Sequence, residues 1–195
     1  NDAGTHLRGL ARDATELTES GLTPQILCGP DSPLAGQPGE RLSRVFEGLA
    51  AVHAAAPAVM DNGRVWTYRE MDTAANRFAH LLAGRGVRPG DRVALLLDRS
   101  AETYIAILAV MKAGAVFVPL APAFPEERMS LIVEDAGVSL VVTNAGYAPR
   151  AAALSVPHLV IAADCPQAAA QPDTPLEIAA GEDDTCYILY TSGTT

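Results

Sequence analysis

The chain has 195 residues, a hydrophobic fraction of 49% and a formal net charge of −9. Its length allows one domain of ordinary size or a large piece of a bigger one, and its hydrophobic content is enough for a packed core. The negative charge argues against non-specific binding to nucleic acid, and no apolar run approaches the roughly 18 residues that a membrane-spanning helix needs.

The cysteine and histidine residues show no metal-binding pattern. Cys28, Cys165 and Cys186 lie far apart in the sequence and form no CxxC pair. An odd number of cysteines is more typical of a reducing compartment than of a disulfide framework, so we expect a cytoplasmic protein. We expect His53 and His80, which fall near predicted helix faces, to have structural roles.

The first 38 residues differ in composition from the rest of the chain. Apolar residues recur at helical spacing over residues 5–20, which predicts a short amphipathic helix. Residues 23–40 are rich in proline and glycine, as is typical of a linker or an extended strap. We therefore divide the chain into a leader helix with a linker, residues 1–38, and a compact domain, residues 39–195.

The compact domain is expected to begin with a helix and a β-hairpin. Apolar residues at a period of about 3.6 predict the helix over residues 42–50. Two apolar runs, residues 58–61 and 64–67, flank Asn62-Gly63, which is the strongest short signal for a hairpin.

Two helix starts carry capping signals. Thr67 and Glu70 have the spacing of a capping box, in which each side chain bonds the other residue's backbone N–H, and the helix that follows should end at Gly84 or Gly86. Ser100 can cap a later helix, with Glu102 in its first turn and Lys112 in its last turn. We interpret Lys112 as a lysine that complements the helix dipole, not as a ligand for a nucleotide.

From residue 92 onward, strands and helices are expected to alternate. Continuous apolar runs predict strands over residues 92–97, 115–118, 140–143 and 158–161. The intervening segments predict a helix with a buried stripe of Tyr104, Ile105, Leu108 and Met111, a helix from Pro125 to Gly137, and a short helix within residues 144–157. This alternation is typical of a parallel sheet flanked by helices, which is the α/β class.

The C-terminal part carries the candidate site. Residues 162–184 predict an exposed connection, in which the acidic run 182–184 is a solvated turn and not a metal site. Cys186–Tyr190 predict a buried strand, which runs into Thr191-Ser192-Gly193-Thr194-Thr195. Hydroxyl donors around a glycine suit a phosphate, because the glycine lets backbone N–H groups approach closely. These five residues alone are equally compatible with a surface turn.

The same stretch, with two others, resembles a known family. Tyr190–Thr195 resembles the opening of the phosphate-binding motif of adenylate-forming enzymes, which include acyl-CoA ligases, luciferases and the adenylation domains of nonribosomal peptide synthetases. Trp66–Met71 and Met111–Pro119, which continues to Met129, resemble two further motifs of the peptide-synthetase domains. Ala121 departs from the usual aspartate, and the chain stops before the second half of the phosphate motif. The motifs occur in order over residues 40–195.

The resemblance implies a fold and an activity. It implies the N-terminal part of the large domain of an adenylate-forming enzyme, with a mostly parallel sheet, flanking helices and an N-terminal hairpin. It also implies that the intact protein uses ATP and Mg²⁺ to convert a carboxylic acid to an acyl-adenylate. An amino acid is the expected substrate. The acyl group would pass to the phosphopantetheine thiol of a peptidyl carrier protein in nonribosomal peptide synthesis.

By the same resemblance, Thr191, Ser192, Gly193, Thr194 and Thr195 would hold the β- and γ-phosphates of ATP. No catalytic or metal-binding residue is expected within the chain, which we expect to be inactive alone, and a small helper protein is a further expected partner. Two alternatives stay open: a fatty-acid or aryl-acid CoA ligase, and a noncatalytic scaffold. An unrelated α/β nucleotide-binding domain would leave the motifs as coincidence.

Overall fold

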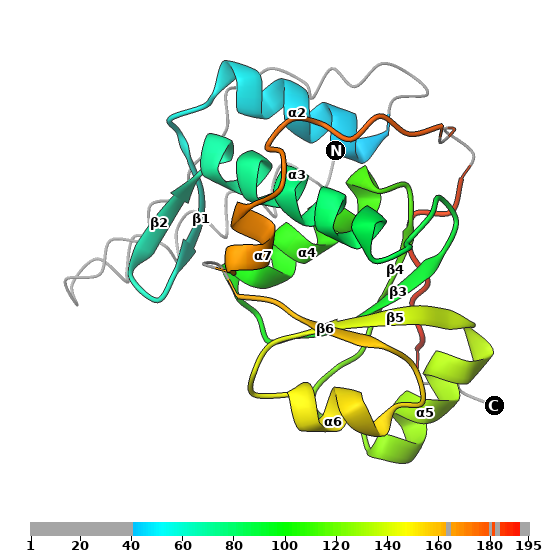
Figure 1. Cartoon of the computed structure of the whole chain (residues 1–195). Helices are drawn as coiled ribbons and strands as arrows, with labels where there is room; N and C mark the ends of the chain where they lie inside the picture. The colour runs from blue at the N-terminus through cyan, green and yellow to red at the C-terminus, as the bar shows by residue number, and fades with distance from the viewer. Residues whose placement is uncertain (1–40, 163–164, 180, 182–183, 192–195) are drawn as a thin grey trace, which may run out of the picture. The chain divides into compact units, whose positions relative to one another are not determined.

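The computed structural model describes residues 41–162, 165–179, 181 and 184–191. These residues all belong to one compact unit, which spans residues 37–195. The expected leader, residues 1–38, lies outside the described residues. A parallel sheet lies between two layers of helices, and an antiparallel hairpin stands beside them, so the α/β class is confirmed (Figure 1).

The central sheet has four parallel strands in the order β4-β3-β5-β6. Their bounds are β3 (Arg92–Leu96), β4 (Val116–Pro119), β5 (Val138–Thr143) and β6 (His158–Val160). Strand β3 lies inside the sheet, where Val93 pairs with Phe117 on one side and with Leu140 on the other. Strands β3 and β5 are mostly apolar and buried, because helices cover both faces of the sheet.

Two buried clusters form the core, one on each face of the sheet. Val93 and Leu95 face α3 (Tyr68–Gly84) and α4 (Ala101–Lys112), whereas Ala94 and Leu96 face α5 (Glu126–Asp135) and α6 (Ala148–Ala153). Helix α2 (Leu42–Val52) contacts both α3 and α4, and the short α7 (Pro166–Ala169) contacts α3. Figure 1 shows the resulting helix–sheet–helix layers.

The hairpin and its junction with α3 agree with the local signals. Strands β1 (Pro57–Asp61) and β2 (Arg64–Thr67) pair antiparallel across Asn62 (φ 49°) and Gly63 (φ 78°), both in the left-handed region that a tight hairpin turn requires. The capping box is present: the Glu70 N–H donates to Thr67 Oγ1 (3.2 Å), and the Thr67 N–H donates to Glu70 Oε2 (2.8 Å). Both predictions are confirmed.

The start of α4 differs from the prediction. Ser100 occupies the N-cap position but its side chain makes no capping bond; instead Asp61 of the hairpin accepts from the Ala101 N–H at 3.1 Å. Tyr104 was expected in the buried stripe, yet its side chain is 51% exposed. The small residues Ala106 and Ala109 are buried instead, because α4 is sandwiched between the sheet and other helices.

Two further corrections concern segment ends. Pro125 is the N-cap residue of α5, one position before the first helical residue where it was expected. Part of the predicted exposed connection packs on the domain, because the Asn76 side-chain amide of α3 donates to the Asp173 carbonyl at 2.8 Å. His80 Nε2 lies 3.0 Å from the Thr174 carbonyl oxygen, in keeping with the structural role expected for it.

Candidate functional site

The segment that leads to the predicted phosphate-binding residues lies along the edge of the sheet at β4. The Phe117 N–H donates to the Cys186 carbonyl and the Ile188 N–H donates to the Phe117 carbonyl, both at 3.1 Å. This parallel bridge between Phe117 and Tyr187 is isolated, so the prediction of a buried strand over residues 186–190 is wrong. Tyr187 and Leu189 are 56% and 61% exposed, so this side of the segment is not part of the core.

Side chains of this segment alternate between contacts with the core and exposure. The Cys186 sulfur lies 3.4 Å from the Met111 sulfur, and the Tyr187 ring stacks on Phe117 with centroids 5.5 Å apart. Tyr190 Oη donates to Asp135 Oδ2 at 2.5 Å. Burial raises the pKa of the Cys186 thiol, and the hydrogen bond to the Asp135 carboxylate raises the pKa of the Tyr190 phenol.

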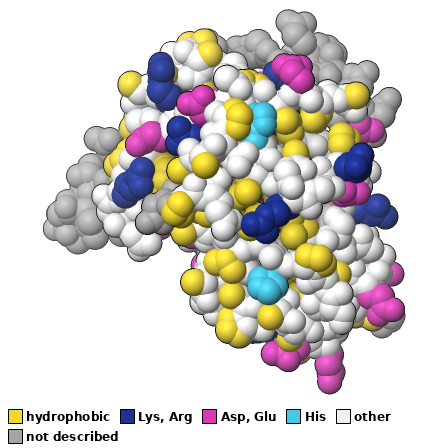
Figure 2. Space-filling view, in the orientation of Figure 1, with side chains coloured by type: hydrophobic (Ala, Val, Ile, Leu, Met, Phe, Trp, Pro, Cys, Tyr) yellow, Lys and Arg dark blue, Asp and Glu magenta, His cyan; other side chains and the backbone are white. Residues whose placement is uncertain are grey.

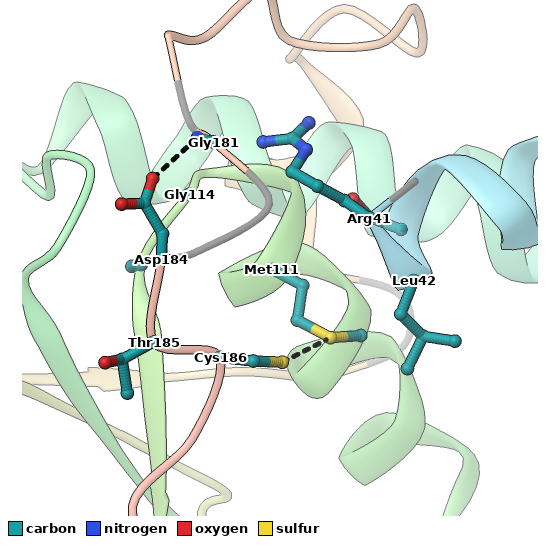
Figure 3. Close-up of a pocket in the computed structure, with 10 residues that line it drawn as sticks. Arg41, Leu42, Met111, Gly114, Gly181, Asp184, Thr185 and Cys186 are labelled. Carbon is teal, nitrogen blue, oxygen red and sulfur yellow. Dashed lines mark hydrogen bonds between the residues drawn. The ribbon is translucent and has the colours of Figure 1, made fainter. Parts of the chain in front are cut away.

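A pocket of about 180 Å³ opens beside this segment (Figure 3). Its lining comes from the start of α2, the end of α4 and the turn after it, Gly181, and residues 184–186. In Figure 3, Cys186 points toward Met111, and the Asp184 carboxylate accepts from the Gly181 N–H at 2.7 Å. Thr191 does not line this pocket. We therefore do not assign the predicted phosphate site to it.

The structure locates only the start of the predicted phosphate-binding stretch. Thr191 is exposed and directly follows Tyr190, whereas Ser192, Gly193, Thr194 and Thr195 lie outside the described residues. Their role toward phosphate stays a prediction. Within the part of the chain that the structure describes, no group of three or more histidine, cysteine, aspartate or glutamate side chains is arranged to hold a metal ion.

Lys112 lies in the last turn of α4, as predicted, and has a further role that was not predicted. Its side chain is 1% exposed, and Nζ lies 2.6 Å from Glu47 Oε1 and 2.9 Å from Asp72 Oδ1. The lysine therefore joins α2, α3 and α4 through one buried ion cluster instead of serving only the helix dipole. No side-chain surface is left on which it could meet a nucleotide.

Sequence reasoning missed the contacts that tie together the loops after β3, β4 and β5. The Arg150 guanidinium donates to the Pro122 carbonyl (2.5 Å) and the Phe124 carbonyl (2.6 Å), in the loop between β4 and α5. Tyr147 Oη donates to Asp98 Oδ1 at 2.6 Å, and this bond raises the pKa of Tyr147. No signal in the sequence pairs these residues, because each pair is separated by more than 20 positions.

Exposed charges are distributed over the visible face of the domain. Figure 2 shows Lys or Arg side chains and Asp or Glu side chains interspersed with apolar ones.

None of the helices among the described residues has the length and apolar character needed to cross a membrane.

Comparison with known proteins gives consistent matches. A family model for AMP-binding enzymes matches residues 46–195. Surfactin synthase subunit 2 of Bacillus subtilis (strain 168) is 39% identical over 157 residues, which cover 80% of this chain and 4% of that protein. The isonitrile lipopeptide synthase of Mycobacterium tuberculosis (strain ATCC 25618 / H37Rv) is 44% identical over 140 residues, which cover 72% of this chain and 5% of that protein.

Solved structures agree with this result. The nonribosomal peptide synthetase FmoA3 with bound alpha-methyl-L-serine-AMP superposes with a TM-score of 0.71 and 30% identity, over 83% of this chain and 18% of that one. The anthranilate CoA ligase AuaEII in complex with anthranoyl-AMP superposes with a TM-score of 0.72 and 26% identity, over 84% of this chain and 33% of that one. The chain thus spans only a small part of these relatives.

Proposed function

Because this chain belongs to the AMP-binding family of adenylate-forming enzymes, we propose that the intact protein activates a carboxylic acid as its acyl-adenylate. ATP is the second substrate, and pyrophosphate leaves. The observation that carries the proposal is the match over residues 46–195, within which all three motifs quoted above lie. Residues 39–195 would form the N-terminal part of the large domain, and residues 1–38 a leader and linker.

The proposed reaction must overcome charge repulsion. A carboxylate attacks the α-phosphate of a polyanion, and a second polyanion departs. Hydroxyls of Thr191, Ser192, Thr194 and Thr195, with backbone N–H groups around Gly193, would donate to the β- and γ-phosphates. Mg²⁺, when bound, neutralises phosphate charge. Positioning and electrostatic stabilisation are then the main contributions to catalysis.

An amino acid is the substrate class that the relatives favour. The curated relative at 44% identity is named for lipopeptide synthesis. FmoA3 is described with an aminoacyl-AMP bound. We therefore propose transfer to the phosphopantetheine thiol of a peptidyl carrier protein in the cytoplasm, with a small helper protein as a further partner.

A CoA ligase is the second candidate. The supporting observation is the superposition on AuaEII and, with a TM-score of 0.71 and 28% identity, on a fatty acyl CoA synthetase of Mycobacterium tuberculosis. These identities, 26% and 28%, are slightly lower than the 30% of the superposed nonribosomal peptide synthetase FmoA3. We accordingly rank this reading second.

The test is carboxylate-dependent ATP–pyrophosphate exchange by the intact protein, with a panel of amino, aryl and fatty acids. Exchange with an amino acid supports the proposal, and exchange restricted to aryl or fatty acids supports the ligase. Absence of exchange with every acid, in folded protein with ATP and Mg²⁺, contradicts both and supports a noncatalytic scaffold. The isolated 195-residue chain should show no exchange in any case.

The phosphate-binding residues have their own test. Thr191→Ala combined with Gly193→Ala removes one hydroxyl and adds a methyl group where backbone N–H groups must approach phosphate. We expect a large rise in KM for ATP in pyrophosphate exchange. A double variant that uses ATP as well as the parent protein would contradict the assignment.

A further inference from the structure

Beyond the contact of the Cys186 sulfur with Met111, the last described residues are attached to the domain by hydrogen bonds at two places. The first is the pair of backbone hydrogen bonds at Phe117. The second is the hydrogen bond from Tyr190 Oη to Asp135 Oδ2 at 2.5 Å. Leu189, between the two places, is 61% exposed. Within the described residues, the Tyr190 hydroxyl therefore makes the last hydrogen bond before the predicted phosphate-binding stretch begins at Thr191.

The acceptor of this bond belongs to a rigid part of the fold. Asp135 is the last residue of α5, and Met129, Ile132 and Val133 of that helix are buried against the sheet. Gly137 ends the helix with a φ of 62°, and β5 begins at the next residue. Asp135 is therefore held in a fixed relation to the central strands.

The position of Asp135 is unfavourable for its own helix. A carboxylate in the last turn of a helix opposes the partial negative charge of that end, and α5 has no basic residue in its last turn. The phenol of Tyr190 donates a hydrogen bond to this carboxylate and offsets part of that cost.

We propose that Tyr190 and Asp135 are a positioning pair that fixes where the stretch Thr191–Thr195 starts relative to the sheet. The inference rests on the proposed function, because it assigns the pair to the handling of ATP phosphates. Neither side chain touches ATP; both act through the stretch. Hydroxyl and N–H donors bind phosphate only at hydrogen-bond distance, so a displaced starting point weakens several of these bonds together.

The chain offers a matched control. Tyr190→Phe removes only the hydroxyl, Asp135→Ala removes the acceptor, and Asp135→Asn keeps an acceptor oxygen without the charge. Tyr147→Phe removes a tyrosine–aspartate bond of the same kind, 2.6 Å long, at another place in the fold. All variants are made in the intact protein.

The first readout is pyrophosphate exchange. We expect Tyr190→Phe and Asp135→Ala each to raise KM for ATP about fivefold, the double variant to be no worse than either, and Asp135→Asn to be intermediate. KM for the carboxylic acid should be unchanged. Tyr147→Phe should leave both KM values unchanged. A merely structural role would lower the unfolding temperature and affect both substrates alike.

The second readout does not depend on activity. Amide hydrogen exchange of residues 190–195, without nucleotide, should accelerate about three- to tenfold in Tyr190→Phe and Asp135→Ala but not in Tyr147→Phe. Unchanged exchange in Tyr190→Phe would overturn the positioning pair. Accelerated exchange with an unaltered KM for ATP would overturn its assignment to ATP. A parent protein without pyrophosphate exchange contradicts the proposed function, and hydrogen exchange still decides whether the pair positions the stretch.

Discussion

Replacement of Lys112 by methionine should destabilise the domain by about 3 kcal/mol, the lower end of the range for breaking a buried ion pair. Methionine keeps most of the aliphatic length, so the cavity contribution is small. The main cost comes from Glu47 and Asp72, whose side chains are only 17% and 21% exposed and would lose the charge 2.6 Å and 2.9 Å away. Because both carboxylates keep some contact with water, we place the loss of stability at the lower end of the range for buried ion pairs.

The partners allow this reasoning to be tested further. Glu47→Gln should cost less, about 1–2 kcal/mol, because Asp72 still compensates Lys112. The combination of Lys112→Met with Glu47→Gln should cost less than the sum of the single changes by at least about 1 kcal/mol. Arg44→Met is the control: Arg44 pairs with the same Glu47 at 2.9 Å but is 39% exposed, so its loss should cost less than about 1 kcal/mol.

The assay is urea unfolding of the 195-residue chain. Trp66, the single tryptophan of the sequence, is 6% exposed and reports unfolding by its fluorescence. Free energies are extrapolated to water for each variant. A Lys112→Met variant whose free energy of unfolding lies within about 1 kcal/mol of the parent's would refute the reasoning. If the ion cluster is formed, loss of the buried lysine leaves two carboxylates without their counter-charge, and this destabilises the domain by more than that amount.

Four further outcomes are expected. Thr67→Ala should cost about 1 kcal/mol in the same unfolding assay. The hydrogen bond from the Thr67 backbone N–H lowers the pKa of Glu70 below its ordinary value of 4.5. The stabilisation by the charged carboxylate is therefore present above pH 4.5 and is lost as the pH falls through the lowered pKa. The free energy of unfolding of Glu70→Gln should accordingly differ from that of the parent at pH 7 and converge with it in acid. Gly63→Ala should cost about 1 kcal/mol through backbone conformation alone, because φ is 78° and no atom lies within 4 Å of the added Cβ. An unchanged midpoint of urea unfolding would contradict this. Cys186, in a variant whose other two cysteines are serine, should react with a disulfide reagent at pH 8 more slowly than free cysteine, because burial raises its pKa, and urea should abolish the difference.

The features that could be predicted from the sequence depend on residues close together in the chain. The turn at Asn62-Gly63 and the capping box at Thr67 and Glu70 each involve residues at most three positions apart. The order of strands and helices followed from apolar runs and their periods. These signals are local, and in these two places the rest of the fold agrees with the local preference.

The features that could not be predicted depend on distant partners. The ion cluster of Lys112 joins residues 40 and 65 positions away, and Asp61 substitutes for the predicted Ser100 cap across 40 positions. The apolar run Cys186–Tyr190 has the composition of a buried strand, but burial depends on what covers each face, and composition does not report that. The candidate phosphate site remained a prediction because only its first residue is described.

The position of β3 between β4 and β5 has a consequence during synthesis on the ribosome. Strand β3 is made first, yet its hydrogen-bonding partners end at residues 119 and 143. Until then its two edges can pair with any other extended chain, and only α3 and α4 are available early to cover one of its faces. The nascent domain therefore passes through an interval of roughly 50 residues in which a chaperone or a slow translation step would protect an unpaired apolar strand.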